Sequence, residues 1–423
     1  MDVQPKKTKG KSGDFGARFE RLFAELCGQR FLKGFVFHSP KFYNPTEEEA
    51  GDVTLWIRRM VVNFELVSQN SALSNSTKKF VRKIGHKRDQ LIRDRATFHD
   101  PEIEIQFQNE LNQTVVFDKS DLQDCSYSGV VLVDCEIPLE KMHFESFKKS
   151  MKTDFPLAIM TLDGFRDLMT EVDTIPDLVY YLEDRHHFVN TVFRNTPNVF
   201  LDLNRDTEKS LISFYKLNEN QFVSEQWSES ATDHFPTAYK SKWSEHINAR
   251  NAENEVSEVI DDIADYLRQL GSENAKLHAW ELAMLSRRQR AVGIGPKVRD
   301  ALIQLPQGRE KRYFAYFNQA TGCWLLFYFR YGGTPDEFRD ELDVLAMQKL
   351  LVEIAGRDFE YSVFGYGFRK STIETGTSFD DVWLTIADAD KVARPLRPRD
   401  LEEAQLLFHG GKPSKLKEFP DAD

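Results

Sequence analysis

The chain has 423 residues, 41% of them hydrophobic and 29% charged, which is typical of a globular protein with two or three domains. Its net charge of −11 excludes a surface that is basic all over, although a local basic patch would still be enough to bind nucleic acid. The four cysteines lie far apart without a CxxC pair, which argues against a disulfide framework and a cysteine-based zinc site.

The start of the chain and its hydropathy predict where the protein is found. The first eleven residues contain four lysines but no apolar segment of the kind found in a secretory signal. No run of about 18 apolar residues is available to cross a membrane. We therefore expect a cytoplasmic protein with no membrane partner, in which residues 1–13 form a disordered basic tail.

The N-terminal region alternates between helical and strand-like patterns. Apolar residues at helical spacing predict a helix over 14–28, and the segment RFLKGFVFHSP after it reads as a strand. A polar, proline-containing loop is expected over 39–50. Two short strands follow, of which the first begins at Asp52 and the second contains Glu65 near its end.

A basic helix is predicted over residues 78–97, directly after these strands. Its basic side chains up to residue 95 are Lys78, Lys79, Arg82, Lys83, Lys87, Arg88, Arg93 and Arg95, and its acidic ones are Asp89 and Asp94. Eight positive and two negative charges give +6 in an acidic chain. One-sided charge of this kind suits contact with a phosphate backbone, and a solvated helix face is the alternative.

The remaining chain predicts further strands over 102–135, helices from about residue 160, and an irregular aromatic stretch over 200–245. Two helices, over 253–271 and 273–295, precede an alternation of strands and one long helix. We therefore predict an α/β (α+β) fold class: a mixed sheet flanked by helices, then a mostly helical middle, then an α/β C-terminal region. The predicted boundaries after the tail are 14–150, 151–250 and 251–423.

The two carboxylates in the neighbouring strands suggest a metal site. Alternation along the second strand places Glu65 and Val67 on one face, opposite the larger apolar residues. Mg²⁺ binds one or two protein carboxylates and completes its shell with water and phosphate oxygens. The alternative is that Glu20, Asp52 and Glu65 are unrelated surface acids, but a carboxylate in the run VVNFELV needs an opening or a partner.

The order of these features resembles the PD-(D/E)XK (restriction-endonuclease-like) nuclease superfamily: a helix with Glu20, a strand, Asp52, Glu65 on the next strand, then a basic helix with Gln90. The resemblance covers residues 14–98 and rests on a short motif. It implies that Asp52 and Glu65 bind Mg²⁺ or Mn²⁺, with Glu20 in support. It also implies substrate contacts from Lys83, Arg88 and Gln90.

The sequence departs from that pattern at position 67, where valine replaces the lysine of the E-x-K tripeptide. A lysine there orients or deprotonates the attacking water and offsets phosphate charge, and valine can do neither. Either Lys87 of the basic helix replaces it, since such cations migrate between elements in this superfamily, or the site is inactive.

Two functions follow from these alternatives. The first is metal-dependent hydrolysis of nucleic-acid phosphodiesters, with DNA favoured over RNA and with Glu20, Asp52, Glu65 and Lys87 as catalytic residues. The resemblance places such proteins in restriction, repair or phage defence, where many act as homodimers. The second is a catalytically inactive scaffold that binds nucleic acid or a protein.

Three other motifs favour ordinary structural roles. His186 and His187 are adjacent on a predicted helix, so their side chains point about 100° apart and are more consistent with packing than with a shared metal. GIGPKVRDAL lacks the spacing of a phosphate-binding loop and reads as a turn and helix start. The aromatic strands over 312–331 read as buried sheet more than as a platform for stacking bases.

Overall fold

In the computed structural model the chain forms two compact units, residues 1–243 and 244–423. The residues described are 13–30, 35–44, 46–49, 51–57, 59–68, 77–100, 102–108, 114–116, 126–134, 153–172, 174–195, 205–218, 220–222, 237–287, 289–304, 311–318, 320–354, 362–371, 379–389 and 408. Mixed sheets and helices occur in both units, which confirms the predicted α+β class. Of the predicted basic tail, residues 1–12 lie outside the described residues, and Gly13 is the first residue of the first helix.

The elements of the first unit alternate between helix and strand. In chain order they are α1 (Gly13–Arg30), β1 (Val36–His38), β2 (Lys41–Asn44), β3 (Thr46–Glu49), β4 (Val53–Ile57), β5 (Met60–Ser68), α2 (Thr77–Phe98), β6 (Glu104–Gln108), β7 (Thr114–Val116), β8 (Ser126–Asp134), β9 (Leu157–Thr161), α4 (Leu162–Glu171), α5 (Ile175–Asn195) and α6 (Arg205–Leu217).

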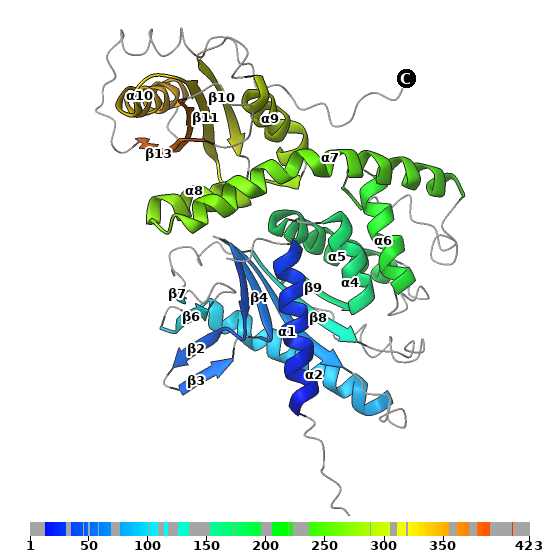
Figure 1. The fold of residues 1–423 in the computed structure, drawn as a ribbon. Coiled ribbons are helices and arrows are strands. Elements are labelled where there is room, and N and C mark those ends of the chain that lie inside the picture. The colour runs from blue at the N-terminus through cyan, green and yellow to red at the C-terminus, as the bar shows by residue number, and fades with distance from the viewer. Residues whose placement is uncertain are drawn as a thin grey trace, which may run out of the picture. The chain divides into compact units, whose positions relative to one another are not determined.

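A five-stranded mixed sheet forms the centre of the first unit, with strand order β1-β4-β5-β8-β9 (Figure 1). The pairs β1–β4 and β4–β5 are antiparallel, whereas β5–β8 and β8–β9 are parallel. The parallel step from β5 to β8 requires a crossover, and this connection contains α2. Because β9 lies at residues 157–161, the sheet includes chain on both sides of residue 150.

Helices cover both faces of this sheet. On one face the ring of Phe64 in β5 contacts Phe23 of α1 and Phe165 of α4, with centroid distances of 5.0 and 5.3 Å. On the opposite face α2 packs with Ile84, Leu91 and Phe98 into the core that contains Val61 and Val67. The alternation predicted for β5 is confirmed, and Val67 is a core residue beneath α2.

A second, four-stranded sheet corrects the loop predicted over 39–50. This segment contains β2 and β3, and the sheet has the order β3-β2-β6-β7. Phe42 is buried against Phe98 of α2, with ring centroids 5.4 Å apart.

The stretch predicted to be irregular over 200–245 is also corrected, since it contains α6 and the start of α7 (Thr237–Gln269). Helix α6 forms because Leu211 and Phe214, three residues apart, lie on one face and are buried in the core of the first unit. Helix α7 extends across the boundary between the two units.

The second unit contains a four-stranded sheet covered by helices. After α7 its elements are α8 (Glu273–Ala283), the π-helix η6 (Gln289–Ile294), α9 (Gly295–Gln304), β10 (Lys311–Asn318), β11 (Cys323–Tyr331), α10 (Pro335–Ile354), β12 (Ser362–Lys370) and β13 (Asp381–Asp388). The strand order is β10-β11-β12-β13, with β11 and β12 parallel and joined through α10.

The core of this unit confirms most of the aromatic prediction and corrects two helix boundaries. Phe327 and Phe329 of β11 are fully buried, whereas Tyr313 of the edge strand β10 is exposed. The single helix predicted over 273–295 ends at Ala283, because the Arg290 side chain donates to the carbonyls at positions 283 and 285. The turn predicted at GIGP is instead a π-helix that leads directly into α9.

None of the helices within the described ranges combines the length and the apolar composition needed to cross a bilayer.

Candidate functional site

Asp52 lies directly before β4 and is held there by hydrogen bonds to β5. Its backbone N–H donates to the carbonyl oxygen of Phe64 (2.9 Å), and its Oδ2 accepts from the backbone N–H of Leu66 (2.6 Å). The preceding Gly51 has a φ of +95°, and a Cβ at this position would lie 2.2 Å from Oδ1 of Asn63. Any side chain at position 51 would therefore face both backbone strain and a clash, so glycine and the sheet together fix the Asp52 carboxylate.

Lys87 of α2 reaches both predicted carboxylates. Its Nζ lies 2.5 Å from Oε2 of Glu65, and 3.1 and 3.2 Å from Oδ2 and Oδ1 of Asp52. The Lys87 side chain is 26% exposed, whereas those of Glu65 and Asp52 are 0% and 9% exposed. The cluster therefore consists of two buried acids and one basic side chain that reaches solvent.

Glu65 has an unsatisfied oxygen. Its Oε2 accepts from Lys87, but its Oε1 is buried and has no hydrogen-bond partner. Burial, followed by the negative charge of Asp52, raises the pKa of Glu65 to about 9, against the opposing effect of Lys87. A buried carboxylate oxygen without a donor or cation is costly. Oε1 is therefore an open position for a positively charged or hydrogen-bonding ligand.

Asp52 and Glu65 favour the charged form of Lys87. Burial on its own would lower the pKa of Lys87, but the charges of Asp52 and Glu65 outweigh burial and raise it. Lys87 is therefore an ammonium ion at neutral pH and donates to both acids.

A polar network fixes α2 on the sheet behind this cluster. Nδ2 of Asn63 donates to Oδ2 of Asp94 and to the hydroxyl of Tyr127, both at 3.2 Å, and its Oδ1 accepts from Thr54 (2.9 Å). The Tyr127 hydroxyl in turn donates to the carbonyl of Leu91 at 3.2 Å. The contacts with Asp94 and with the Leu91 carbonyl join α2 to the central strands, so they fix the helix from which Lys87 projects.

Asp94 is an acidic group of this network that the sequence prediction missed. Burial raises its pKa to about 7, with a contribution from the charge of Asp52 and opposition from Arg93, Asn63 and Lys87. Asp94 lies seven residues after Lys87, which is about two helical turns and places both on the same face of α2. That spacing could have identified it.

Glu20 lies at the edge of the site with a second missed residue, His38. Oε2 of Glu20 is 3.8 Å from Nε2 of His38, which ends β1 and lies opposite the first residue of β4. The nearby His38 ring lowers the pKa of Glu20 against the opposing effect of burial, and the charge of Lys87 contributes to the same lowering. Ser39 has a positive φ of 45°, and its N–H donates to the backbone carbonyl of Asp52 (3.0 Å).

The predicted substrate-binding residues lie around Lys87 on α2. At about 100° per residue, Lys83 and Gln90 are on the same side of the helix as Lys87, and Arg88 is on its flank. Lys83 is exposed, whereas Gln90 and Arg88 are half-buried, and Arg88 pairs with the neighbouring Asp89. The side chains of residues 78 and 79 lie outside the description.

Asp52 and Glu65 are the groups that could hold a divalent cation here. Within the described ranges no cluster of three or more His, Cys, Asp or Glu side chains has a metal-binding arrangement. Two carboxylates nevertheless suit Mg²⁺ or Mn²⁺, which take their other ligands from water and substrate. The open Oε1 of Glu65 and the contacts of both acids with one cation fit such an ion.

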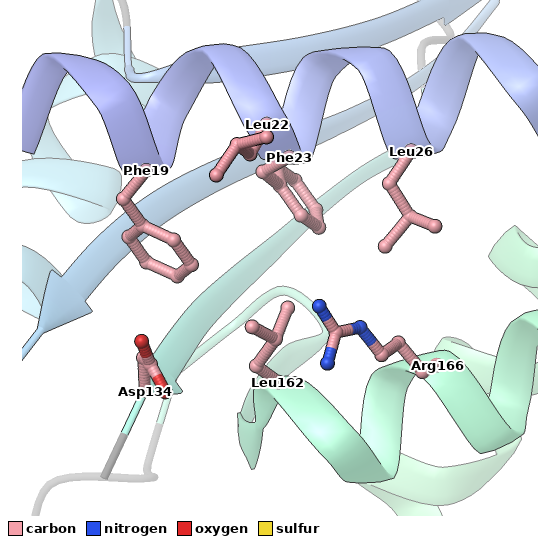
Figure 2. Close-up of a pocket in the computed structure, with 7 residues that line it drawn as sticks. All are labelled: Phe19, Leu22, Phe23, Leu26, Asp134, Leu162 and Arg166. Carbon is pink, nitrogen blue, oxygen red and sulfur yellow. The ribbon is translucent and has the colours of Figure 1, made fainter.

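A separate pocket of about 330 Å³ lies on the opposite face of the sheet, between α1, α4 and the end of β8. Figure 2 shows apolar side chains from α1 on one side, and Asp134, Leu162 and Arg166 on the other. The apolar residues of α1 are Phe19, Leu22, Phe23 and Leu26. No predicted site residue lines this pocket. Its lining comes from segments far apart in the chain, and the sequence alone does not show that they meet.

The His186 ring makes structural hydrogen bonds, which agrees with the packing role predicted for it. Nδ1 of His186 accepts from the backbone N–H of Leu157 (3.3 Å), and its Nε2 is 3.0 Å from the side-chain amide of Asn190. The backbone carbonyl of His187 accepts from the Thr191 hydroxyl. His186 thus joins α5 to β9.

Comparison of the chain with family models, with curated proteins and with solved structures gives no match.

Proposed function

We propose that the first unit hydrolyses nucleic-acid phosphodiesters with the help of Mg²⁺ or Mn²⁺ bound by Asp52 and Glu65. One observation carries the proposal: Lys87 reaches both acids from α2, as expected of a cation that replaces the missing lysine at position 67. The order of α1, β1, β4, β5 and α2 also agrees with the resemblance to the PD-(D/E)XK superfamily.

The proposed roles follow from the contacts. A bound Mg²⁺ or Mn²⁺ polarises a phosphoryl oxygen and lowers the pKa of water. Asp52 and Glu65 hold the ion. Lys87 donates a hydrogen bond to a phosphate oxygen or orients the attacking water, and it offsets phosphate charge. Glu20 supports the site through its contact with His38, which lies beside the start of β4.

The substrate proposal rests on the charge of α2. Arg82, Lys83 and Arg93 are exposed on this helix, which favours contact with a phosphate backbone. DNA is the substrate we favour over RNA, in restriction, repair or defence. A homodimer, which would present two such helices, is part of this proposal. The cytoplasm remains the predicted compartment.

An inactive scaffold is the second candidate, and two observations favour it. Val67 is buried beneath α2 and supplies no cation, and the Glu65 side chain has no exposed surface. If Lys87 serves only to neutralise the two acids, the site is a remnant and α2 binds nucleic acid without cleavage.

Cleavage assays distinguish the candidates. The purified protein is incubated with end-labelled single-stranded and double-stranded DNA and with RNA, with Mg²⁺ or Mn²⁺ and with chelator. The nuclease proposal expects metal-dependent products that Asp52→Asn abolishes and that Glu25→Gln, an exposed acid on α1, leaves unchanged. Binding without cleavage by the unmodified protein on every substrate would favour the scaffold.

A further inference from the structure

Lys87 occupies the place that a metal ion needs. Its Nζ lies within 3.2 Å of three carboxylate oxygens, two from Asp52 and one from Glu65. These are the groups that we propose as ligands of Mg²⁺ or Mn²⁺. An ammonium and a divalent ion cannot contact the same oxygens together, because the two positive charges would repel each other at close range in a buried site.

The surroundings allow the side chain to move while the rest of the site stays fixed. The Asp52 carboxylate is held by the Leu66 N–H, and α2 is fixed by the Asn63–Asp94 hydrogen bond. Lys87 itself is partly exposed and has a flexible four-carbon stem. Rotation of this one side chain toward solvent would free both carboxylates.

We infer that Lys87 excludes the metal from the empty site and that substrate phosphate admits it. This inference rests on the proposed function. A phosphate that approaches the exposed end of Lys87 offers the ammonium an alternative anion, and a metal ion then gains Asp52 and the open Oε1 of Glu65. Metal and nucleic acid therefore bind with positive coupling, and each increases the affinity for the other by the same factor.

Calorimetric titration of Mn²⁺ tests the inference through binding alone. The proteins are the unmodified chain, Lys87→Met, and Lys209→Met as a control that removes an exposed lysine on α6. Without nucleic acid we expect Lys87→Met to bind Mn²⁺ at least about tenfold more tightly than the unmodified chain, which corresponds to about 1.4 kcal/mol. Lys209→Met should match the unmodified chain.

A second titration does not depend on Lys87→Met, in case that variant is unstable. Mn²⁺ is added with and without a phosphorothioate oligonucleotide that resists cleavage, and Asp52→Asn/Glu65→Gln provides the background from metal bound to the oligonucleotide. We expect the oligonucleotide to tighten Mn²⁺ binding at least about fivefold over this background, within the usual range of coupling.

The outcomes separate this inference from the proposed function. Equal or weaker Mn²⁺ binding by folded Lys87→Met, or no tightening by the oligonucleotide, overturns the competition while the metal site stands. No Mn²⁺ binding by any of the proteins overturns the metal site and the inference with it.

Discussion

Two buried acid–base pairs of the first unit are built from similar groups but differ in how fully they are satisfied. Arg185 of α5 and Glu208 of α6 form two parallel hydrogen bonds of 2.8 Å, and the Tyr181 hydroxyl donates to the same carboxylate at 3.0 Å. At the other pair, Lys87 makes one hydrogen bond to Glu65 and leaves Oε1 without a partner.

The difference indicates which pair is structural. A bidentate pair with its remaining acceptor filled has nothing to offer a ligand, and it fixes α6 against α5. A buried acid with an open oxygen and a partly exposed lysine is poor for stability, because desolvation is not fully offset. Incomplete satisfaction is typical of sites that a ligand completes.

Of the variants proposed here, Glu65→Gln should have the largest effect on cleavage. A small effect would contradict the distinction between the two pairs. We expect a loss of cleavage of about 1,000-fold, because a neutral amide cannot replace a ligand whose charge is used in the transition state. The free energy of unfolding should not fall, because the variant removes a buried acid. Initial rates and urea denaturation measure the two effects.

A large loss of stability in Glu65→Gln with retained cleavage would reverse the assignment and make this pair the structural one. Glu25→Gln is the matched control, since that acid is exposed on α1.

Glu208→Gln should show the opposite behaviour. Removing one charge leaves Arg185 buried without a counter-ion, and we expect the free energy of unfolding to fall by about 3 kcal/mol. Cleavage per folded molecule should be unchanged. Urea denaturation with activity normalised to the folded fraction checks both points, and a direct loss of activity in fully folded protein would contradict the structural role.

The sequence predicts this site to the extent that its residues lie in local patterns. Alternation in β5 places Glu65 opposite Phe64, and the basic character of α2 makes Lys87 the candidate cation. Both follow from the short periods of strands and helices. The close approach of Gly51 to Asn63, in contrast, depends on strand pairing.

The parts that were missed depend on contacts between distant segments. Asn63 and Asp94 are 31 residues apart, and His38 reaches Glu20 only because α1 packs against β1. The strands β2 and β3 were predicted as loop because their composition is polar, although they pair with each other and β2 pairs with the distant β6. Long-range pairing of this kind leaves no local period in the sequence.

Asp94→Asn tests the buried polar network behind the site through the pH dependence of stability. The pKa of Asp94 is raised to about 7, so the folded state keeps a proton that the unfolded state loses near pH 4. The contribution of Asp94 to stability is therefore greatest at low pH, declines as the pH rises from about 4 to 7, and is lost above 7. An asparagine still accepts from Asn63.

We therefore expect Asp94→Asn to be more stable than the unmodified protein by about 2 kcal/mol at pH 8, after an allowance for relaxation of the buried site. The two should be equally stable near pH 4. Urea denaturation across this range measures the difference. Asp89→Asn, an exposed acid on the same helix, should give no such pH dependence, and a pH-independent effect of Asp94→Asn would refute the assigned titration.

Lys83→Gln should give the smallest effect, because Lys83 is an exposed lysine that contacts neither acid. If its charge meets a phosphate, binding of DNA should weaken by about two- to fivefold at low salt, and the slope of log affinity against log salt should fall in magnitude by about one. Lys209→Gln on α6 removes another exposed lysine outside α2 and should leave that slope unchanged. Fluorescence anisotropy of a labelled duplex at several salt concentrations measures both slopes. Equal changes in the two variants would mean that the chain attracts DNA through its general surface charge, and α2 would lose its role as the substrate-binding helix.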